Sequence, residues 1–431
     1  MKYTNRIIRL YVCAALATLS APALAGGFGI GTQSGSGTGN AFAGGAAAAD
    51  DASVAWSNPA AMTLLPTGKQ VTFAGHVILP SFKFTNNGST GAIGAGLLGT
   101  GNGGDGGDLA VIPNGFFTMS INPNLRFGLA LNVPFGLATE YAPGWQGQVT
   151  ALESEIKTIN INPSLAYKVN DKFSIGGGVS IQKIDAKLSA FTGAVATGNL
   201  ALKADDIGYG FNFGLLAQMT PSTRVGFSYR SRISYDLEGT ATFSGAAAPL
   251  FNGNVRADLK VPESASLSLF STMGDKWELM ADLTHTGWSS IKRLDVIRMN
   301  ASALVAPPPG GAAGSTLTSL QFNWKDTLRI GIGANYKLNN QTKLRFGLAL
   351  DPTPTNDVDR TPRLPDQDRT WLALGVQYKP GKDGVLEVGY AHEFVKDARI
   401  NTAGPTAPAG RLIGSFNSKA DILSVQYSHK F

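Results

Sequence analysis

Apolar residues alternate with small or polar residues over most of the chain beyond residue 68. The segment LRFGLAL occurs twice, at 125–131 and at 344–350, with Leu and Phe on one parity and Arg, Gly and Ala on the other. The segments 224–230 and 328–336 have the same arrangement. A period of two is typical of β-strands. One face of these strands suits lipid and the other is small and polar, which is the inverse of a soluble barrel.

About fourteen such runs are predicted, an even number, as closure of an up-and-down barrel usually requires. They are expected near 69–80, 111–121, 124–137, 154–168, 171–187, 205–219, 222–238, 254–270, 275–298, 320–337, 342–351, 368–379, 384–396 and 417–431. The connections alternate between short turns, rich in Asn, Asp, Pro and Gly, and longer segments. The predicted fold class is therefore all-β, a transmembrane antiparallel β-barrel formed by residues 66–431, with short turns at one end and long loops at the other.

The segment 26–65 consists mainly of Gly, Ala, Ser, Thr, Asn and Asp. It can bury little apolar area, so by itself it could not offset the entropy that is lost when it becomes ordered. Many glycines on the inner face of the predicted strands would leave space in the lumen. We expect residues 26–65 to form an N-terminal plug, or hatch, inside the barrel.

Residues 1–25 have the pattern of a secretory signal peptide: a basic start, an apolar middle and the exit Ala23-Leu24-Ala25. Cleavage is expected before Gly26. Lys2, Arg6 and Arg9 account for half of the formal net charge of +6, so nucleic-acid binding is not expected of the mature chain. The mature chain has no stretch of about 18 apolar residues, and a closed barrel is the other way to cross a membrane.

Cys13, the only cysteine, lies in the predicted signal peptide, so no disulfide, thiol nucleophile or zinc site is expected in the mature chain. No metal or other cofactor is predicted. The last strand ends in an aromatic residue, and Tyr427 and Phe431 resemble the C-terminal signal that is read by the barrel-assembly machinery of the outer membrane. The alternative is an ordinary edge strand that happens to end in Phe.

Short sequence pieces in collinear order resemble the FadL/TodX family of outer-membrane transporters. The pieces near the start are Gly27-Phe28, Asp50-Asp51, Asn58-Pro59-Ala60, Gly136-Leu137-Ala138-Thr139-Glu140-Tyr141 and Trp145. The later pieces are Pro163-Ser164-Leu165-Ala166-Tyr167, Tyr229-Arg230-Ser231, Pro262-Glu263, Trp288-Ser289, Lys325-Asp326, Arg329, Pro365-Asp366-Gln367-Asp368-Arg369 and Trp371. The resemblance covers the whole mature chain.

This resemblance implies passive transport of long-chain fatty acids or other hydrophobic molecules across the outer membrane of a Gram-negative bacterium. External loops would capture the ligand, and a lumen site gated by the plug would pass it sideways into outer-membrane lipid beside a kinked third strand. The resemblance places Phe28 at the lumen site and Asn58, Pro59 and Ala60 in the hatch; an Asn-Pro turn or helix start is the alternative. The protein would act as a monomer, without a cofactor and not as an enzyme.

The predicted lateral opening consists of Asn132, Pro134, Phe135 and Gly136 in the third strand. Pro134 cannot donate a ladder hydrogen bond, and a local bulge there would break pairing with a neighbouring strand. A proline that is merely tolerated near the outer rim is the alternative.

A fatty acid needs cations for its carboxylate. Alternation predicts that five basic side chains point inward: Arg230, Arg232, Lys325, Arg329 and Arg345. The alternative for these residues is a solvated lumen wall. Ala190 and Leu320 stand where the best-known fatty-acid member of the family has basic ligand residues, so a neutral aromatic or alkane ligand remains open.

Two other functions compete with transport of hydrophobic molecules. A non-specific porin would have an open aqueous channel without an N-terminal obstruction. An outer-membrane hydrolase would need a catalytic constellation, but His76, His285, His392 and His429 are scattered, and neither G-x-S-x-G nor H-E-x-x-H occurs.

Overall fold

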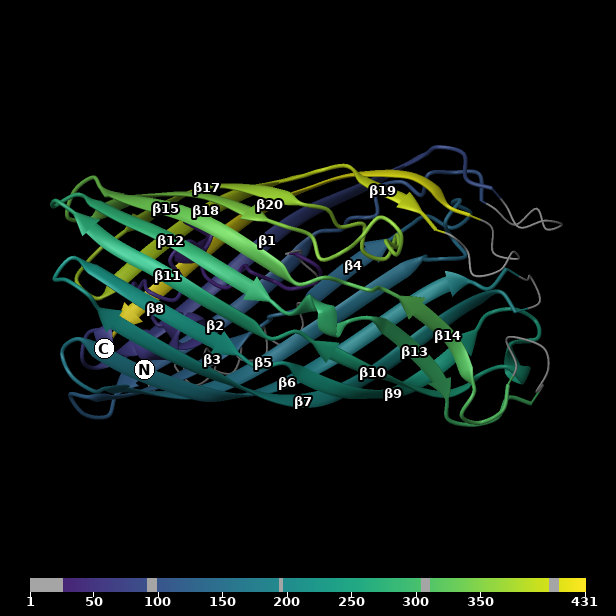
Figure 1. Ribbon diagram of the computed structural model, residues 1–431, viewed down its shortest axis with the longest axis horizontal. Coiled ribbons are helices and arrows are strands. Elements are labelled where there is room, and N and C mark those ends of the chain that lie inside the picture. Colours follow the sequence, from purple (N-terminus) through teal and green to yellow (C-terminus); the bar gives the residue numbers. More distant parts are fainter. Residues whose placement is uncertain (1–25, 91–98, 194–196, 304–310, 403–410) are drawn as a thin grey trace, which may run out of the picture.

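The computed structural model describes residues 26–90, 99–193, 197–303, 311–402 and 411–431. In this part of the chain, twenty strand segments form one antiparallel sheet that closes where β1 (Lys69–Asn86) pairs with β20 (Ile413–Lys430) (Figure 1). Six strands are interrupted and count as two segments each, so the barrel has 14 strands. The predicted fold class is confirmed. The predicted signal peptide, residues 1–25, lies outside the described residues.

The remaining uninterrupted strands are β2 (Ala110–Ser120), β5 (Glu153–Lys168), β6 (Phe173–Phe191), β7 (Asn199–Gln218), β16 (Thr342–Asp351) and β17 (Arg369–Tyr378). The interrupted strands are β3 (Leu125–Asn132) with β4 (Gly136–Glu140), β8 (Thr223–Arg230) with β9 (Ile233–Phe243), β10 (Gly253–Val261) with β11 (Ser264–Met273), β12 (Trp277–Thr286) with β13 (Arg293–Arg298), β14 (Thr316–Gln321) with β15 (Thr327–Lys337), and β18 (Gly384–Val395) with β19 (Ala398–Asn401).

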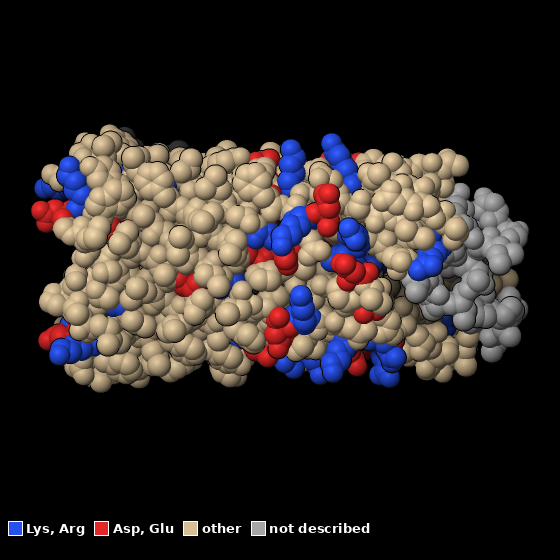
Figure 2. All heavy atoms as spheres, turned by 45° about the horizontal axis from the view of Figure 1, so that its top comes forward, with Lys and Arg blue, Asp and Glu red and all other residues tan. Residues whose placement is uncertain are grey.

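The outer surface of the barrel changes character along its length. In the half with the short turns, outward side chains such as Ile175, Val179 and Phe211 are apolar and exposed. Figure 2 shows charged side chains at the tip of this half and few over the rest of it, whereas Lys, Arg, Asp and Glu gather in a belt beyond it. We assign the half with few charges to the lipid and the charged belt to the outer membrane–water boundary.

The inner surface changes in the opposite sense. Beyond the lipid-facing half, the outward residues become charged, as at Lys183 and Asp236, while inward residues such as Ile184, Tyr235 and Leu237 are apolar and buried. Several strands therefore continue past the ends expected from sequence; β7 begins at Asn199 instead of residue 205. The inverted pattern is that of a barrel standing in water, with an apolar core inside it.

Residues 26–65 lie inside the barrel and contain α2 (Gly35–Gly39), α3 (Val54–Ser57) and η1 (Pro59–Leu64). Two further short 3₁₀ helices, η2 (Ala248–Leu250) and η3 (Trp288–Ser290), belong to the barrel. The plug backbone lies so close to the wall that a Cβ at Gly347 would collide with the backbone of Asn40. Among the described residues, no helix is long and apolar enough to cross a membrane.

Candidate functional site

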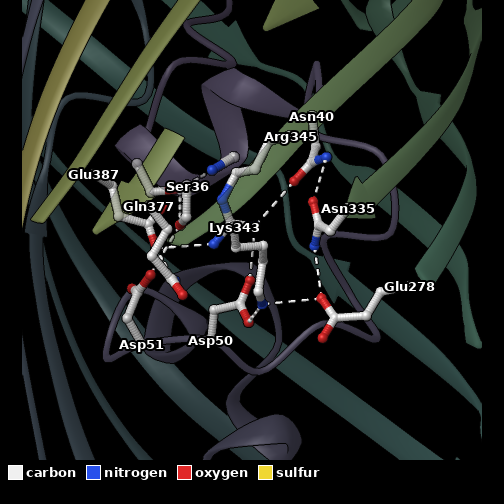
Figure 3. A network of polar contacts seen from close by, with 12 residues as sticks. Ser36, Asn40, Asp50, Asp51, Glu278, Asn335, Lys343, Arg345, Gln377 and Glu387 are labelled. Carbon is white, nitrogen blue, oxygen red and sulfur yellow. Dashed lines mark hydrogen bonds and ion pairs between the residues drawn. The ribbon is translucent and has the colours of Figure 1, made fainter. Parts of the chain in front are cut away.

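Buried ion pairs hold the plug against one side of the barrel (Figure 3). The Arg345 guanidinium, on β16, lies 3.0 Å from the Asp50 carboxylate of the plug and 2.8 Å from the Glu387 carboxylate of β18. The Lys343 ammonium lies 3.5 Å from Asp50 and 2.9 Å from Glu278. Each of these contacts joins charges that would be costly to bury alone.

Neutral side chains extend this network. The Asn40 amide donates to Asn335 Oδ1 at 2.9 Å, and Asp51 Oδ2 accepts from Ser36 Oγ and from Gln426 Nε2, both at 2.8 Å. The plug residues in Figure 3 thus contact β16, β15 and β20 at the same time. This part of the plug is fixed to the wall.

Asn58, Pro59 and Ala60 are buried and pack on β6 and β7. Asn58 Oδ1 accepts from the Ala60 N–H at 3.0 Å, which caps η1, while its Nδ2 donates to the carbonyls of Ala46 and Leu215. A Cβ at Gly214 would collide with Asn58 Oδ1. The sequence offered a hatch element and a helix start as alternatives for this segment. The segment has both features, since it starts a helix and packs on the wall.

The third strand is interrupted between β3 and β4. Asn132 is opposite Asn160 and Gly136 is opposite Lys157, so three residues face two and the strand carries a bulge. The Thr158 hydroxyl, on β5, replaces the missing backbone hydrogen bonds of the ladder. It accepts from the Phe135 N–H at 3.0 Å and donates to the Phe135 carbonyl at 2.7 Å.

The wall has a gap on the other side of this bulge. The pairing of β2 with β3 ends at Gly115 and Leu131, and among the described strands β4 pairs with β5 alone. The N-terminal segment lies here instead. The Gly136 N–H donates to the Phe28 carbonyl at 2.9 Å, and the Ile30 N–H donates to the Pro134 carbonyl at 2.8 Å. A short stretch of the plug therefore takes the place of a neighbouring strand.

Phe28, in the N-terminal segment of the plug, lies in an aromatic cluster with residues of the wall. Its ring centroid is 5.2 Å from Trp288, 5.7 Å from Phe135 and 5.7 Å from Trp324. The side chain is only 3% exposed. The sequence singled out Phe28, Phe135 and Trp288, but not Trp324, which lies in the interruption between β14 and β15.

The connection between β16 and β17 crosses to the opposite wall beside β4. The Tyr141 hydroxyl donates to the Pro362 carbonyl at 2.7 Å, and Arg363 donates to the Glu153 carbonyl at 3.1 Å and to Ser154 Oγ at 3.0 Å. Burial lowers the pKa of the Arg363 guanidinium to about 10. The same connection contacts the start of the plug segment, because the Gly27 N–H donates to Asp366 at 3.0 Å.

A cavity of about 320 Å³ lies inside the barrel, bordered by the N-terminal segment, the plug and the wall strands β8, β11, β12 and β15. Trp288 and Phe135 border it, together with Ser266, Thr284 and other hydroxyl-bearing residues. This size lies within the range of small-molecule sites.

Three of the five basic residues border this cavity: Arg230, Arg329 and Arg345. Arg345 is already paired with Asp50 and Glu387, and Arg329 donates to the Ala41 carbonyl and lies 3.8 Å from Asp282. Arg230 lies over the Trp56 ring at 3.2 Å and donates to the Trp56 carbonyl. Among the described residues, Arg230 has no carboxylate within ion-pair distance.

The inward orientation predicted for Arg232 and Lys325 is wrong. Arg232 is exposed and pairs with Glu263 at 2.8 Å, and Lys325 is exposed as well. Arg232 lies between β8 and β9, and Lys325 lies between β14 and β15. The backbone is irregular at each interruption, so the alternation of inward and outward side chains does not continue through it. The orientation of a residue in an interruption therefore could not be predicted from the neighbouring strand.

Tyr427 and Phe431, at the end of the chain, are exposed, and the Tyr427 hydroxyl lies 3.2 Å from His429 Nδ1. Within the described ranges, no group of three or more His, Cys, Asp or Glu side chains could hold a metal ion.

The barrel, its lipid-facing surface and the anchored plug define a plugged membrane channel of the outer-membrane type. Residues 16–431 match the model of the outer membrane protein transport protein (OMPP1/FadL/TodX) family, and the chain belongs to that family. It is therefore an outer-membrane protein of a family of transport proteins.

Several relatives are similar over nearly their whole length. A putative outer membrane protein of Neisseria meningitidis is 29% identical, with 94% of this chain and 95% of that one covered. A long-chain fatty acid transport protein of Escherichia coli is 26% identical, with 97% of each covered. The crystal structure of a Pseudomonas aeruginosa FadL homologue superposes with a TM-score of 0.83 at 28% identity, covering 94% of this chain and 100% of that one.

Proposed function

We propose that this protein transports long-chain fatty acids or other hydrophobic molecules passively across the outer membrane and releases them sideways into the bilayer. The observation that carries the proposal is the N-terminal segment, which bears Phe28 and occupies the gap in the wall beside the bulged third strand. A ligand that displaces this segment from the aromatic cluster would at the same time unblock the gap.

The contacts of the plug support a movement of its first residues only. Residues from Ser36 to Asp51 are tied to the wall by buried ion pairs and hydrogen bonds, whereas Phe28 and Ile30 are held at the gap by backbone hydrogen bonds. Displacing a few hydrogen bonds costs much less than separating buried ion pairs. The Asn58-Pro59-Ala60 segment acts in this proposal as a fixed support.

The surroundings of the cavity suit an amphipathic ligand. An apolar chain would contact Phe135 and Trp288, which border the cavity, and a carboxylate would approach Arg230, which has no acidic partner among the described side chains. Long-chain fatty acids fit both requirements, and a relative is named as a transporter of these molecules. A neutral aromatic or alkane ligand, which uses the aromatic cluster alone, is the second candidate.

Replacing Pro134 and Gly136 with Val tests the route. A Cβ at Gly136 would lie 2.8 Å from the Ile30 side chain, so Val must displace the N-terminal segment or close the bulge. Uptake of a radiolabelled fatty acid by whole cells should fall, while heat-modifiable migration of the folded barrel is retained. Normal uptake by a correctly assembled variant would contradict lateral release.

The ligand is identified by native mass spectrometry or lipid extraction of the purified barrel. Replacement of Arg230 with Met should weaken binding of a fatty acid and leave binding of an alkane of equal length unchanged. Equal binding of both ligands by the variant and the parent would favour a neutral substrate. We further propose that the protein works as a monomer and that its C-terminal strand, with Tyr427 and Phe431, engages the barrel-assembly machinery.

A further inference from the structure

The ladder of the wall is interrupted a second time, between β7 and the interrupted strand β8–β9. Pairing of β7 with β8 ends where Asn212 is opposite Arg230, and pairing of β7 with β9 resumes where Asp205 is opposite Glu238. Residues 206–211 thus face residues 231–237, one residue more, which is the arrangement of a β-bulge. We call these two facing segments the β7–β9 seam.

Side chains replace the ladder at both ends of the seam. At one end, the Ser231 hydroxyl accepts from the Phe211 N–H at 2.9 Å, and the Ser231 N–H donates to the Phe211 carbonyl at 2.9 Å. At the other end, the Asp206 carboxylate accepts from the Asp236 N–H at 2.7 Å. The two strands are therefore held together at the ends of the seam.

The middle of the seam is covered by two side chains of β9 that lie over a glycine of β7. A Cβ at Gly208 would collide with the Ile233 side chain and would lie 2.7 Å from the Tyr235 ring. The Tyr235 hydroxyl accepts from Gln182 Nε2, on β6, at 2.7 Å. Ile233 and Tyr235 are both buried. Side-chain packing, and not a backbone ladder, closes the wall here.

The inner side of the seam adjoins the surroundings of the cavity. Ile233 and Tyr235 belong to the same buried apolar cluster as Phe28. Arg230, which borders the cavity, directly precedes the seam residue Ser231. A ligand whose carboxylate lies at Arg230 would therefore have an apolar path for its chain along the inner side of the seam.

The outer side of the seam faces lipid. Tyr209 is 72% exposed and Phe211 is exposed as well, and both lie on the lipid-facing side of β7. The seam also lies on the same row of cross-strand partners as the bulge of the third strand: Ile159, beside that bulge, is opposite Lys183, which is opposite Ile207. The panel of β5, β6 and β7 thus has a break in its ladder on each side.

We propose that the β7–β9 seam is a second lateral opening, through which an apolar ligand passes between the lumen and the lipid. Rotation of Ile233 and Tyr235 away from Gly208 would uncover the seam and break the hydrogen bond between Tyr235 and Gln182. Opening a regular part of the wall would instead break several backbone hydrogen bonds. This inference rests on the proposed function, because it adds a route for the same ligand.

A reversible cross-link across the seam tests the inference. A Cβ at Gly210 would lie 2.9 Å from Ser231 Oγ, so Gly210→Cys with Ser231→Cys places two thiols within reach of a disulfide. Cys13 is the only cysteine of the sequence and lies in the predicted signal peptide, so no other pairing competes. Fatty-acid uptake by whole cells should fall several-fold after oxidation and return after addition of dithiothreitol.

The matched control is a cross-link within a regular part of the ladder. Thr223 and Ser271 are opposite each other on β8 and β11, and their hydroxyl oxygens lie 2.8 Å apart. Thr223→Cys with Ser271→Cys should take up fatty acid equally well in the oxidised and reduced states. Equal uptake in both states by the Gly210→Cys/Ser231→Cys barrel as well would overturn the inference, and the bulge would then only shape the wall.

A measurement on the parent protein keeps the inference falsifiable if the cysteine variant fails to assemble. A fatty acid with a photoactivatable diazirine in its chain should label Ile233 or Tyr235 of the purified barrel in lipid nanodiscs, and excess unlabelled fatty acid should compete. Labelling of residues 133–136 without labelling of these two residues would overturn the second opening and leave the proposed transport intact. A parent barrel that takes up no fatty acid would overturn both.

Discussion

Arg345 and Arg232 carry the same charge on the same barrel, yet their surroundings differ completely. Arg345 is 1% exposed between Asp50 and Glu387, whereas the Arg232 side chain is 41% exposed beside Glu263. Removing one partner of a buried ion pair leaves an uncompensated charge, while an exposed pair is screened by water. The consequences of the same substitution at the two sites should therefore differ several-fold.

Arg345→Met is expected to lower the free energy of unfolding of the barrel by about 3–5 kcal/mol, because it leaves the buried Glu387 carboxylate without its cation and leaves Asp50 with Lys343 alone. Arg232→Met should lower it by less than about 1 kcal/mol. Urea unfolding of the two purified variants, followed by tryptophan fluorescence, measures the difference. Similar losses at both positions would contradict the assignment of Arg345 to the plug anchor.

Sequence alternation predicted the orientation of Arg230, Arg329 and Arg345 because each lies within a regular strand segment. It failed for Arg232 and Lys325, which lie in interruptions. The partners of Arg345 could not be predicted either. Asp50 is nearly three hundred residues away, and an alternating pattern states which face a residue occupies but not which plug residue meets it.

At the scale of elements, the bulge between β3 and β4 is held by a residue of another strand. Pro134 indicated an irregularity in the sequence, and the structure places it there. Thr158 gave no such indication, because a threonine on the inner face of a predicted strand is ordinary. Nor could sequence predict that residues 28–30 lie beside residues 134–136, since the plug segment lacks any strand pattern.

Thr158→Val should disturb this bulge while keeping the shape of the side chain. The N–H and carbonyl of Phe135 would lose their partner, at a cost of about 1–3 kcal/mol, and the third strand would no longer hold the N-terminal segment in register. We expect a lower thermal unfolding temperature and slower fatty-acid uptake. Thr158→Ser keeps the hydroxyl and should behave like the parent; if Ser and Val variants were equally impaired, the hydroxyl would not be the cause.

For the whole molecule, the pattern of apolar and polar residues predicted a closed barrel with fourteen strands because a lipid-facing surface has a simple period. The same pattern underestimated the length of several strands. Beyond the lipid, the apolar residues turn inward, as at Ile184 and Tyr235, and the parity that marked the outer surface then marks the inner one. The barrel lies partly in lipid and partly in water. A rule that expects apolar residues on the outer face therefore holds only for the part in lipid.

The plug obstructs the lumen of the barrel, so its removal should change the conductance of the barrel. Removing residues 26–65 while keeping residues 1–25 should leave a barrel that still assembles, because the wall is closed by pairing of β1 with β20 and the plug replaces a strand only beside the bulge of the third strand. The space released is lined by Arg345, Glu387 and other polar side chains, so water should fill it.

Single-channel conductance in planar bilayers should therefore rise well above that of the parent, and entry of small hydrophilic solutes into cells should increase. The Arg345→Met variant provides an intermediate, since it weakens the anchor without shortening the chain. Heat-modifiable migration checks that each barrel has assembled. An assembled deletion variant with the conductance of the parent would mean that residues 26–65 do not obstruct the lumen, and the proposed gate would then have to lie in the external loops.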